Sequence, residues 1–270
     1  MAAGAAAGRI PAGPPPDRPG DERNGEAPAP GGVSSPGELI ATVSHELRQP
    51  LASIRGFTEM LLGHWDDFTD GDKVDILGAV HHDALRLSRL VDELLDVSRL
   101  ESGRMPLFRR ETDIAPLVHR VLADLKLVYP ELQATVEIPA RFPPLAADPF
   151  KLEQVLANIL ENACKYGSPG TVRISLAERS GPGRGTAEIA VSDQGAGIDP
   201  EELPHITEKF FHRGAESEVG GLGLGLWISR GIVEAHGGAL VATSGRGQGT
   251  TVRFTIPLHQ GRSAGKLAGP

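Results

Sequence analysis

A histidine followed by a glutamate, at positions 45 and 46, is the pair of residues in this chain best suited to chemistry. The apolar residues around the pair recur every three or four positions, as on a helix that packs along one side; they are Ile40, Val43, Leu47, Ile54, Phe57 and Leu61. At about 100° per residue, His45 falls roughly opposite the seam that Val43 and Leu47 form. The spacing predicts an exposed imidazole with a carboxylate, Glu46, placed to take up a proton.

Two residues after this pair bear on its presentation. Gln49 comes one helical turn after His45 and shares its face, and Pro50 follows directly. Proline has no N–H and a fixed φ, so we expect a bend here and a free carbonyl at Glu46. Taken alone, the stretch is more typical of a solvated histidine on a surface helix, and the rest of the chain decides between the two interpretations.

A second group of polar residues lies on the predicted helix 149–166. Asn158 and Asn162 are four residues apart and share a face, Lys165 lies near that face, and Tyr166 follows it. Amide oxygens beside a cation suit hydrated Mg²⁺ bound to phosphates, because Mg²⁺ keeps most of its waters and takes few protein ligands. Two exposed amides on an ordinary amphipathic helix would give the same pattern.

A carboxylate followed by glycines ends the predicted strand 186–192. Asp193 can accept a hydrogen bond from the amino group of an adenine, and Gly195 and Gly197 would let the backbone approach a flat base. A plain turn after a strand is the alternative, since Asp-x-Gly-x-Gly alone is a weak signal.

A glycine-rich stretch, 220–226, opens a predicted helix. Free N–H groups and the helix dipole make such a helix start an anion site, with Gly221, Gly223 and Gly225 lining it; a flexible hinge is the alternative. The stretch lacks the Lys and Ser or Thr of a Walker A loop, and it does not sit in the parallel βαβ unit of a Rossmann fingerprint.

The composition excludes several classes of protein. Of the 270 residues, 40% are apolar and only 4% aromatic, so a sizeable and mostly aliphatic core is expected. The net charge of −8 and the lack of a basic run argue against nucleic acid as a partner. Cys164 is the only cysteine, which excludes an intrachain disulfide and fits a reducing, cytoplasmic compartment. No apolar run approaches the roughly 18 residues of a membrane span, although the chain could be a piece of a longer membrane protein.

The pattern along the chain predicts four parts. Residues 1–34 are rich in Ala, Gly, Pro and charge, which predicts disorder. Residues 35–103 predict two helices in an antiparallel hairpin, running to about residue 62 and from about 73 to 102. The stripes of one hairpin need more partner surface, which a homodimer with a four-helix bundle would supply; packing against the second domain is the alternative. Residues 104–260 predict an α+β domain, and 261–270 a loose tail.

Hydrophobic periodicity and turn residues mark the elements of the α+β part. The expected helices are 113–127, 149–166 and 222–236, and the expected strands are 134–138, 171–177, 186–192, 239–244 and 250–258.

In this order, the motifs resemble those of the sensor histidine kinases of two-component systems, over residues 36–258. The stretch 44–51 is similar to that family's H box, with His45 as phosphoacceptor. Residues 156–167 resemble its N box, 206–211 its F box, and 193–197 and 221–225 its G1 and G2 boxes. The resemblance implies an α+β chain in which a helical hairpin, a four-helix bundle as a dimer, precedes an α/β sandwich of the Bergerat type.

The resemblance also implies a reaction and its participants. ATP and Mg²⁺ would be bound, His45 would take the γ-phosphoryl group, and an aspartate of a response regulator would receive it next. The segment 100–107 would be the hinge along which the ATP-binding domain reaches His45. Asn162 is the first choice as Mg²⁺ ligand, and the residues expected to hold the nucleotide are Asn158, Asn162, Lys165, Tyr166, Asp193, Gly195, Gly197, Arg213, Gly221, Gly223 and Gly225.

The chain departs from the family pattern at two places. Gln49 stands where the family has Thr or Asn, which puts phosphatase activity in doubt while leaving kinase activity in place. In the F box, which lies in the mobile lid of that family, Thr207 replaces an aromatic residue. His212 follows the aromatic pair, so Arg213 corresponds to the family's arginine only after a shift of one residue.

Two other functions stay open on the sequence. A non-catalytic dimeric regulator that binds nucleotide would share the hairpin and the pocket, and the altered lid favours it. An ATPase of the gyrase or chaperone class would share the nucleotide fold, but it usually has a glutamate base where Asn158 stands and has no need of the stretch at His45.

Overall fold

The computed structural model describes residues 36–167, 171–180, 185–211 and 221–259. The expected disorder of residues 1–34, the expected tail 261–270 and the expected nucleotide ligand Arg213 lie outside these ranges.

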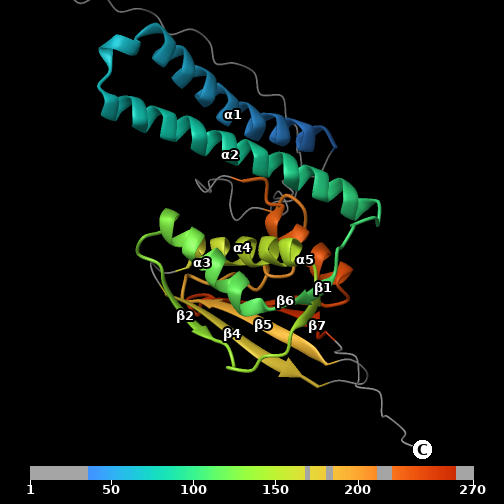
Figure 1. The fold of residues 1–270 in the computed structure, drawn as a ribbon. Helices are drawn as coiled ribbons and strands as arrows, with labels where there is room; N and C mark the ends of the chain where they lie inside the picture. Colours follow the sequence, from blue (N-terminus) through green and yellow to red (C-terminus); the bar gives the residue numbers. More distant parts are fainter. Residues whose placement is uncertain (1–35, 168–170, 181–184, 212–220, 260–270) are drawn as a thin grey trace, which may run out of the picture.

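Two long helices form the N-terminal hairpin (Figure 1). Helix α1 spans Pro36–Gly63 with Pro50 inside it, a short 3-10 turn, η1, spans Trp65–Asp67, and helix α2 spans Asp70–Glu101. Helix α2 begins three residues before the expected start, because Thr69 and Asp72 form a capping box in which each side chain accepts the other's backbone N–H. The antiparallel hairpin predicted from the two apolar stripes is confirmed.

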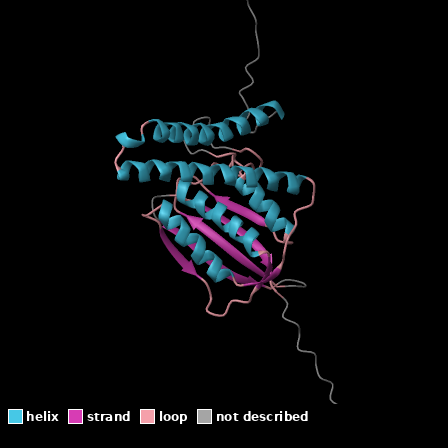
Figure 2. Cartoon of the chain, turned by 45° about the horizontal axis from the view of Figure 1, so that its top comes forward, coloured by secondary structure: helices cyan, strands magenta, loops and turns pink. Residues whose placement is uncertain are grey.

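A five-stranded mixed sheet forms the base of the second part (Figures 1 and 2). Its strand order is β2-β4-β5-β7-β6, with β2 parallel to β4 and the other neighbours antiparallel. The strands alternate buried and more exposed residues, so one face of the sheet supplies the core. Their bounds are Gln133–Glu137 for β2, Thr171–Arg179 for β4, Thr186–Asp193 for β5, Leu240–Ser244 for β6 and Thr250–Pro257 for β7.

Three helices cover that face of the sheet: α3 (Ile114–Val128), α4 (Pro149–Tyr166) and α5 (Gly225–Ala235). Helix α4 has the predicted bounds because its start is strongly marked: Asp148 caps it by accepting the N–H groups of Phe150 and Lys151, and proline occupies its first position. Its buried side chains pack on the sheet, in a core that the sheet, α3 and α5 share.

Two short strands escaped the sequence analysis, and one helix begins later than expected. Strands β1 (Arg110–Thr112) and β3 (Leu145–Ala147) pair antiparallel, but three residues are too few to show an alternating pattern. Helix α5 starts at Gly225 rather than at residue 222, since Gly221 and Gly223 adopt positive φ angles of 148° and 65° that a helix excludes.

The hairpin lies against the helix layer of the sandwich through α2 (Figure 1). Leu90 of α2 is 4% exposed and belongs to the same core as the sheet, and Leu100 packs against Gly231 of α5. Asp96 of α2 is also buried, and its carboxylate binds Lys151 of α4. The sandwich therefore covers one face of the hairpin, which is the packing that we considered as the alternative to a dimer. Other apolar residues of both helices stay exposed.

Candidate functional site

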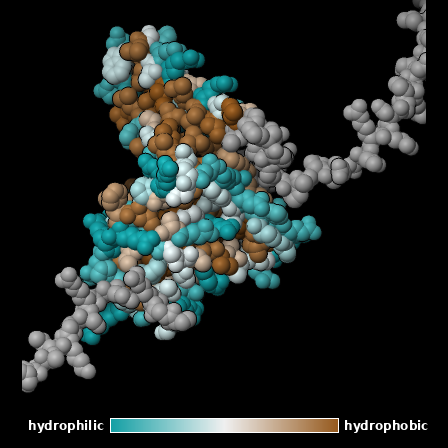
Figure 3. Space-filling model, turned by 90° about the vertical axis from the view of Figure 1, so that its right-hand side faces the viewer, coloured by the Kyte–Doolittle hydropathy of each residue, from teal (hydrophilic) through white to brown (hydrophobic). Residues whose placement is uncertain are grey.

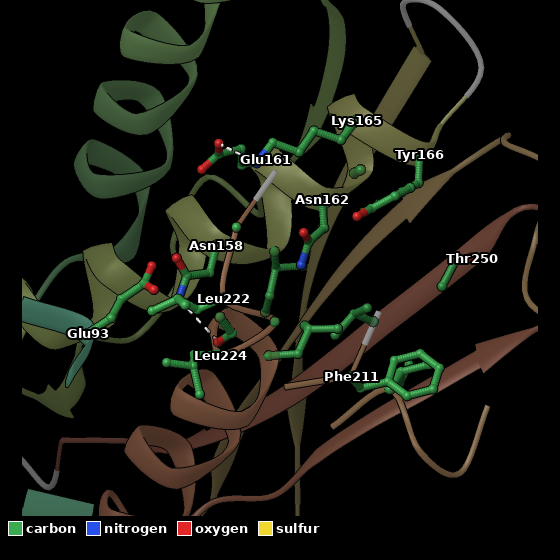
Figure 4. A pocket seen from close by; sticks show the side chains of 18 of the residues that line it. Glu93, Asn158, Glu161, Asn162, Lys165, Tyr166, Phe211, Leu222, Leu224 and Thr250 are labelled. Atoms are coloured by element: carbon green, nitrogen blue, oxygen red, sulfur yellow. Dashed lines mark hydrogen bonds and ion pairs between the residues drawn. The ribbon is translucent and has the colours of Figure 1, made fainter. Parts of the chain in front are cut away.

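A cavity of about 440 Å³ lies between α2, α4, β5, β7 and the segment 221–226 (Figure 4). It is lined by most of the residues expected to hold a nucleotide: Asn158, Asn162, Lys165, Tyr166, Asp193, Gly197, Gly221, Gly223 and Gly225. Residues that are far apart in sequence are thus brought together in one place.

Asp193 is fixed at the floor of the cavity, at the end of β5. Its Oδ1 accepts the N–H of Gly195 at 2.8 Å and the N–H of Thr250 at 3.2 Å. Both bonds use the same carboxylate oxygen, so Oδ2 is left to accept a hydrogen from a ligand. A base with an exocyclic amino group would satisfy it.

Glycines let three backbone segments meet at this floor. A Cβ on Gly195 would lie 2.2 Å from the carbonyl oxygen of Tyr166, and one on Gly197 would lie 1.9 Å from that of Gly245. Gly197 also has a φ of 70°, which L side chains rarely adopt. Gly195 is buried beneath Asp193 and Gly197 lines the cavity, so the two glycines serve different parts of one floor.

The polar residues of α4 line the wall (Figure 4). The amide nitrogen of Asn158 donates to the Gly225 carbonyl at 3.2 Å and to Ser229 Oγ at 3.3 Å, and its amide oxygen takes no part in these bonds. Lys165 lies at the wall with its ammonium 2.9 Å from Glu161, so the cation carries a carboxylate partner that the sequence analysis did not expect. Asn162 lines the cavity one turn beyond Asn158.

The start of α5 faces the cavity. Within the described part of the chain no side chain caps this helix, because its N-cap residue is Leu224. The first N–H groups of a helix need partners, and here they adjoin a polar cavity, which suits an anion. Phe210 donates its N–H to the Gly223 carbonyl and has a φ of 61°, so the last described residues of the predicted lid are held beside this segment; Phe211 lines the cavity.

Helix α2 contributes a stripe to the cavity that the sequence analysis missed: His82, Arg86, Arg89, Leu90 and Glu93. The spacing of four, three and four between its polar members was visible in the sequence. Only the packing of the hairpin on the sandwich places that face of α2 at the cavity. Burial raises the pKa of Glu93 to about 7, with the opposing effect of nearby Arg89 second in size.

The predicted phosphoacceptor lies on α1, outside the described lining of the cavity. The side chain of His45 is 72% exposed, that of Glu46 is 15% exposed, and Gln49 is exposed one turn further along. His45 Nδ1 lies 4.0 Å from Glu46 Oε1, while Arg86 donates to Glu46 Oε2 at 3.0 Å. The presented imidazole with a neighbouring carboxylate, expected from helical spacing, is what the structure contains.

One histidine of the sandwich, His236, has a structural role. His236 is 1% exposed, its Nδ1–H donates to the Ile232 carbonyl, and its Nε2 accepts the N–H of Asp148. Burial lowers the pKa of His236, which agrees with this neutral, fully bonded ring.

Two family models match the chain. The model of the His Kinase A (phospho-acceptor) domain matches residues 36–103, and the model of the histidine kinase-, DNA gyrase B- and HSP90-like ATPase matches residues 147–260. The sensor histidine kinase TrcS of Mycobacterium tuberculosis is 36% identical over 82% of this chain. The chain belongs to the sensor histidine kinases. The phosphoacceptor model separates this sensor kinase chain from gyrases and chaperones that share only the ATPase model.

Other relatives agree with this family. The sensor protein kinase WalK of Staphylococcus haemolyticus is 32% identical over 82% of the chain. The chain spans 43% of the length of TrcS and 36% of that of WalK.

Solved structures show the same fold. Full-length ShkA in complex with AMPPNP matches 84% of this chain and 47% of its own with a TM-score of 0.60 and 27% identity. The Acinetobacter baumannii histidine kinase AdeS matches 80% of this chain and 98% of its own with a TM-score of 0.58 and 23% identity. The predicted fold class, a helical hairpin before a mixed α/β ATPase sheet, is confirmed for this kinase chain, and among its described helices none is both long and apolar enough to cross a membrane.

Proposed function

We propose that this chain transfers the γ-phosphoryl group of ATP to His45 and passes it on to an aspartate of a response regulator. The observation that carries the proposal is the presence on one chain of two features: an exposed imidazole beside a largely buried carboxylate, and a cavity with the donors and acceptors that a nucleotide needs. Either feature alone has an ordinary explanation; the two together on one sensor kinase chain do not.

The nucleotide orientation follows from the polarity of the cavity. Adenine binds at the floor, where Asp193 Oδ2 accepts a hydrogen from its amino group and the apolar Val191 and Val252 line the same end. The triphosphate lies toward Asn158, Asn162, Lys165 and the start of α5, whose N–H groups bind its oxygens. Tyr166 and the glycines of segment 221–225 complete the contacts.

Mg²⁺ fits the residues at the phosphate end. The amide oxygens of Asn158 and Asn162 lie one helical turn apart on the cavity wall, and a small set of neutral oxygen ligands suits an ion that keeps most of its waters. When bound, with Asn162 as first choice of ligand, the ion offsets phosphate charge.

The reaction needs positioning more than covalent chemistry from the protein. Nδ1 of His45 faces Glu46, so Nε2 is the nitrogen that attacks the γ-phosphorus. The new N–P bond forms as the bond from phosphorus to the bridging oxygen breaks, and its electron pair leaves with ADP. The proton on Nδ1 passes toward Glu46 Oε1.

The two parts of the chain must move for this reaction, since the described lining of the cavity leaves out His45. We infer that residues 35–103 and 104–260 are separate domains, and that the segment 100–107 between α2 and β1 is the hinge. A homodimer through the hairpin and a response regulator are the proposed protein partners.

Incubation of the protein with γ-labelled ATP and Mg²⁺ tests the proposal. We expect a label that is stable in base and lost in acid, as a phosphohistidine is, and that is absent from His45→Gln. His81→Gln, which changes an exposed histidine of α2, is the matched control and keeps the label.

A chain that binds a fluorescent ATP analogue yet takes no label would instead be the nucleotide-binding dimeric regulator. Label that survives His45→Gln would contradict the choice of acceptor.

A further inference from the structure

Arg86 of α2 reaches the carboxylate beside the phosphoacceptor. Its Nη2 donates to Glu46 Oε2 at 3.0 Å, across the hairpin and 40 residues along the chain. The other oxygen of that carboxylate, Oε1, is the one 4.0 Å from His45 Nδ1. Glu46 therefore stands between an imidazole and a guanidinium, with one oxygen directed to each.

The burial of the three side chains fits this order. His45 is 72% exposed, Arg86 is 31% exposed and Glu46 is 15% exposed. A largely buried carboxylate needs a partner, and one oxygen held by a guanidinium fixes the direction of the other. Without that bond, rotation about the side-chain torsions of Glu46 would carry Oε1 away from the imidazole.

We propose that Arg86 is a positioning residue for phosphoryl acceptance, which holds the Glu46 carboxylate so that Oε1 can take the Nδ1 proton of His45. The inference rests on the proposed function, in which His45 Nε2 forms the bond to phosphorus and ADP leaves with the electron pair. Arg86 touches neither the ring nor phosphorus in this role and acts through Glu46.

The same guanidinium lines the nucleotide cavity, so a direct contact with phosphate is the competing role. The two roles differ in what they change. A residue that acts through Glu46 alters the maximal rate of labelling, whereas a phosphate contact alters the KM for ATP.

The test is a double-mutant cycle between Arg86→Gln and Glu46→Gln, with the initial rate of His45 labelling measured over a range of ATP concentrations. We expect Arg86→Gln to lower the maximal rate roughly tenfold, less than the roughly hundredfold or more that loss of a general base itself costs, because Glu46 stays in place; KM should be nearly unchanged. In the Glu46→Gln background the same change should have almost no effect, and Arg86→Lys should restore much of the rate. Arg55→Gln is the control, an arginine of α1 whose side chain is 75% exposed and pairs with Glu59.

Three results would overturn the inference: an unchanged maximal rate in Arg86→Gln, an equal loss in both backgrounds, or a loss confined to KM. With any of these three results His45 would still be phosphorylated, so the proposed function would stand. Absence of label in the unmodified protein would instead remove the proposed function and this inference with it.

Discussion

Asp193 shows how one side chain can be committed to two kinds of partner. Oδ1 accepts two backbone N–H groups, from Gly195 and Thr250, and Oδ2 is left for the ligand. Asn in its place puts an NH₂ group either against those donors or against the adenine amino group. We expect Asp193→Asn to weaken binding of a fluorescent ATP analogue by about tenfold or more, because a hydrogen bond becomes a clash of donors.

Asp124→Asn is the control for this measurement, since Asp124 is an exposed carboxylate on α3, outside the cavity. Equal affinities of the unmodified protein, Asp193→Asn and Asp124→Asn for the ATP analogue would refute the placement of adenine at Asp193.

Glu93 makes the stability of the packed protein depend on pH. Burial of this α2 residue at the cavity wall raises its pKa from 4.5 to about 7, and Arg89, Glu161, Lys165 and Asp96 are the charged groups that act on it. The folded protein thus binds more protons than the unfolded chain between these values, so stability falls as pH rises through this window. The full penalty, on the order of 3 kcal/mol at roughly 1.4 kcal/mol per pKa unit, is present above the upper value.

We therefore expect Glu93→Gln to raise the melting temperature relative to the unmodified protein at about pH 8 and to lose this advantage toward about pH 5. Glu131→Gln, at an exposed position, should follow the unmodified protein throughout. Parallel melting profiles for Glu93→Gln and the unmodified chain would show that the carboxyl is ionised in both states.

Sequence patterns identified the site residues that are marked by their neighbours in the sequence. They missed the residues that reach the site only because distant elements pack together. Asp193 is identifiable because glycines follow it at the end of a strand, and His45 because helical spacing places it opposite an apolar seam. Thr250 donates only a backbone N–H, which any residue type could do. Arg86 faces the cavity only because α2 lies on the sandwich.

The same distinction holds for whole elements. The bounds of helix α4 could be predicted to the residue, because a capping aspartate and a proline mark its start. Strands β1 and β3 could not be predicted, because each is a strand only through its pairing with the other. Helix α5 begins later than expected because the glycines before it adopt positive φ angles. The same glycines line the cavity, so the departure from the expected helix belongs to the site.

Helices α2 and α4 are joined by a buried ionic cluster. Asp96 is 2% exposed, and its carboxylate accepts from Lys151 Nζ at 2.6 and 2.8 Å and from Gln154 at 2.9 Å. Removing one partner of such a cluster leaves the other buried without compensation. We expect Asp96→Ala to lower the free energy of unfolding by about 3 kcal/mol, measured by urea denaturation.

Asp92→Ala, one turn earlier on an exposed part of α2, is the matched control and should change little. The double variant Asp96→Leu with Lys151→Met should lose less than Asp96→Ala, because it removes the carboxylate together with Lys151 and of the charged partners leaves only Arg99, whose side chain is 48% exposed. Equal losses in Asp96→Ala and Asp92→Ala would mean that the cluster contributes nothing to the docking of α2.

The whole molecule leaves an apolar surface on the hairpin that the sandwich does not cover, and the space-filling view shows such side chains gathered there (Figure 3). On α2 the exposed residues Val74, Leu77, Val91 and Leu95 fall on the a and d positions of one heptad frame. Leu90 of the same helix is buried against the sandwich, so α2 has two apolar faces and the structure fills one. A second hairpin would cover the other, which is the four-helix bundle that the stripes predict.

If a second copy occupies this face, charges placed in its centre must separate the protomers. We expect Leu77→Glu with Val91→Glu to give a monomer where the unmodified protein is a dimer, as measured by sedimentation or light scattering, because two buried carboxylates would face their symmetry mates. Val241→Glu, at a 58% exposed apolar residue of β6, adds charge elsewhere and should leave the dimer intact. A dimer that survives the double change would have to use another surface, and the α2 stripe would then need a different partner.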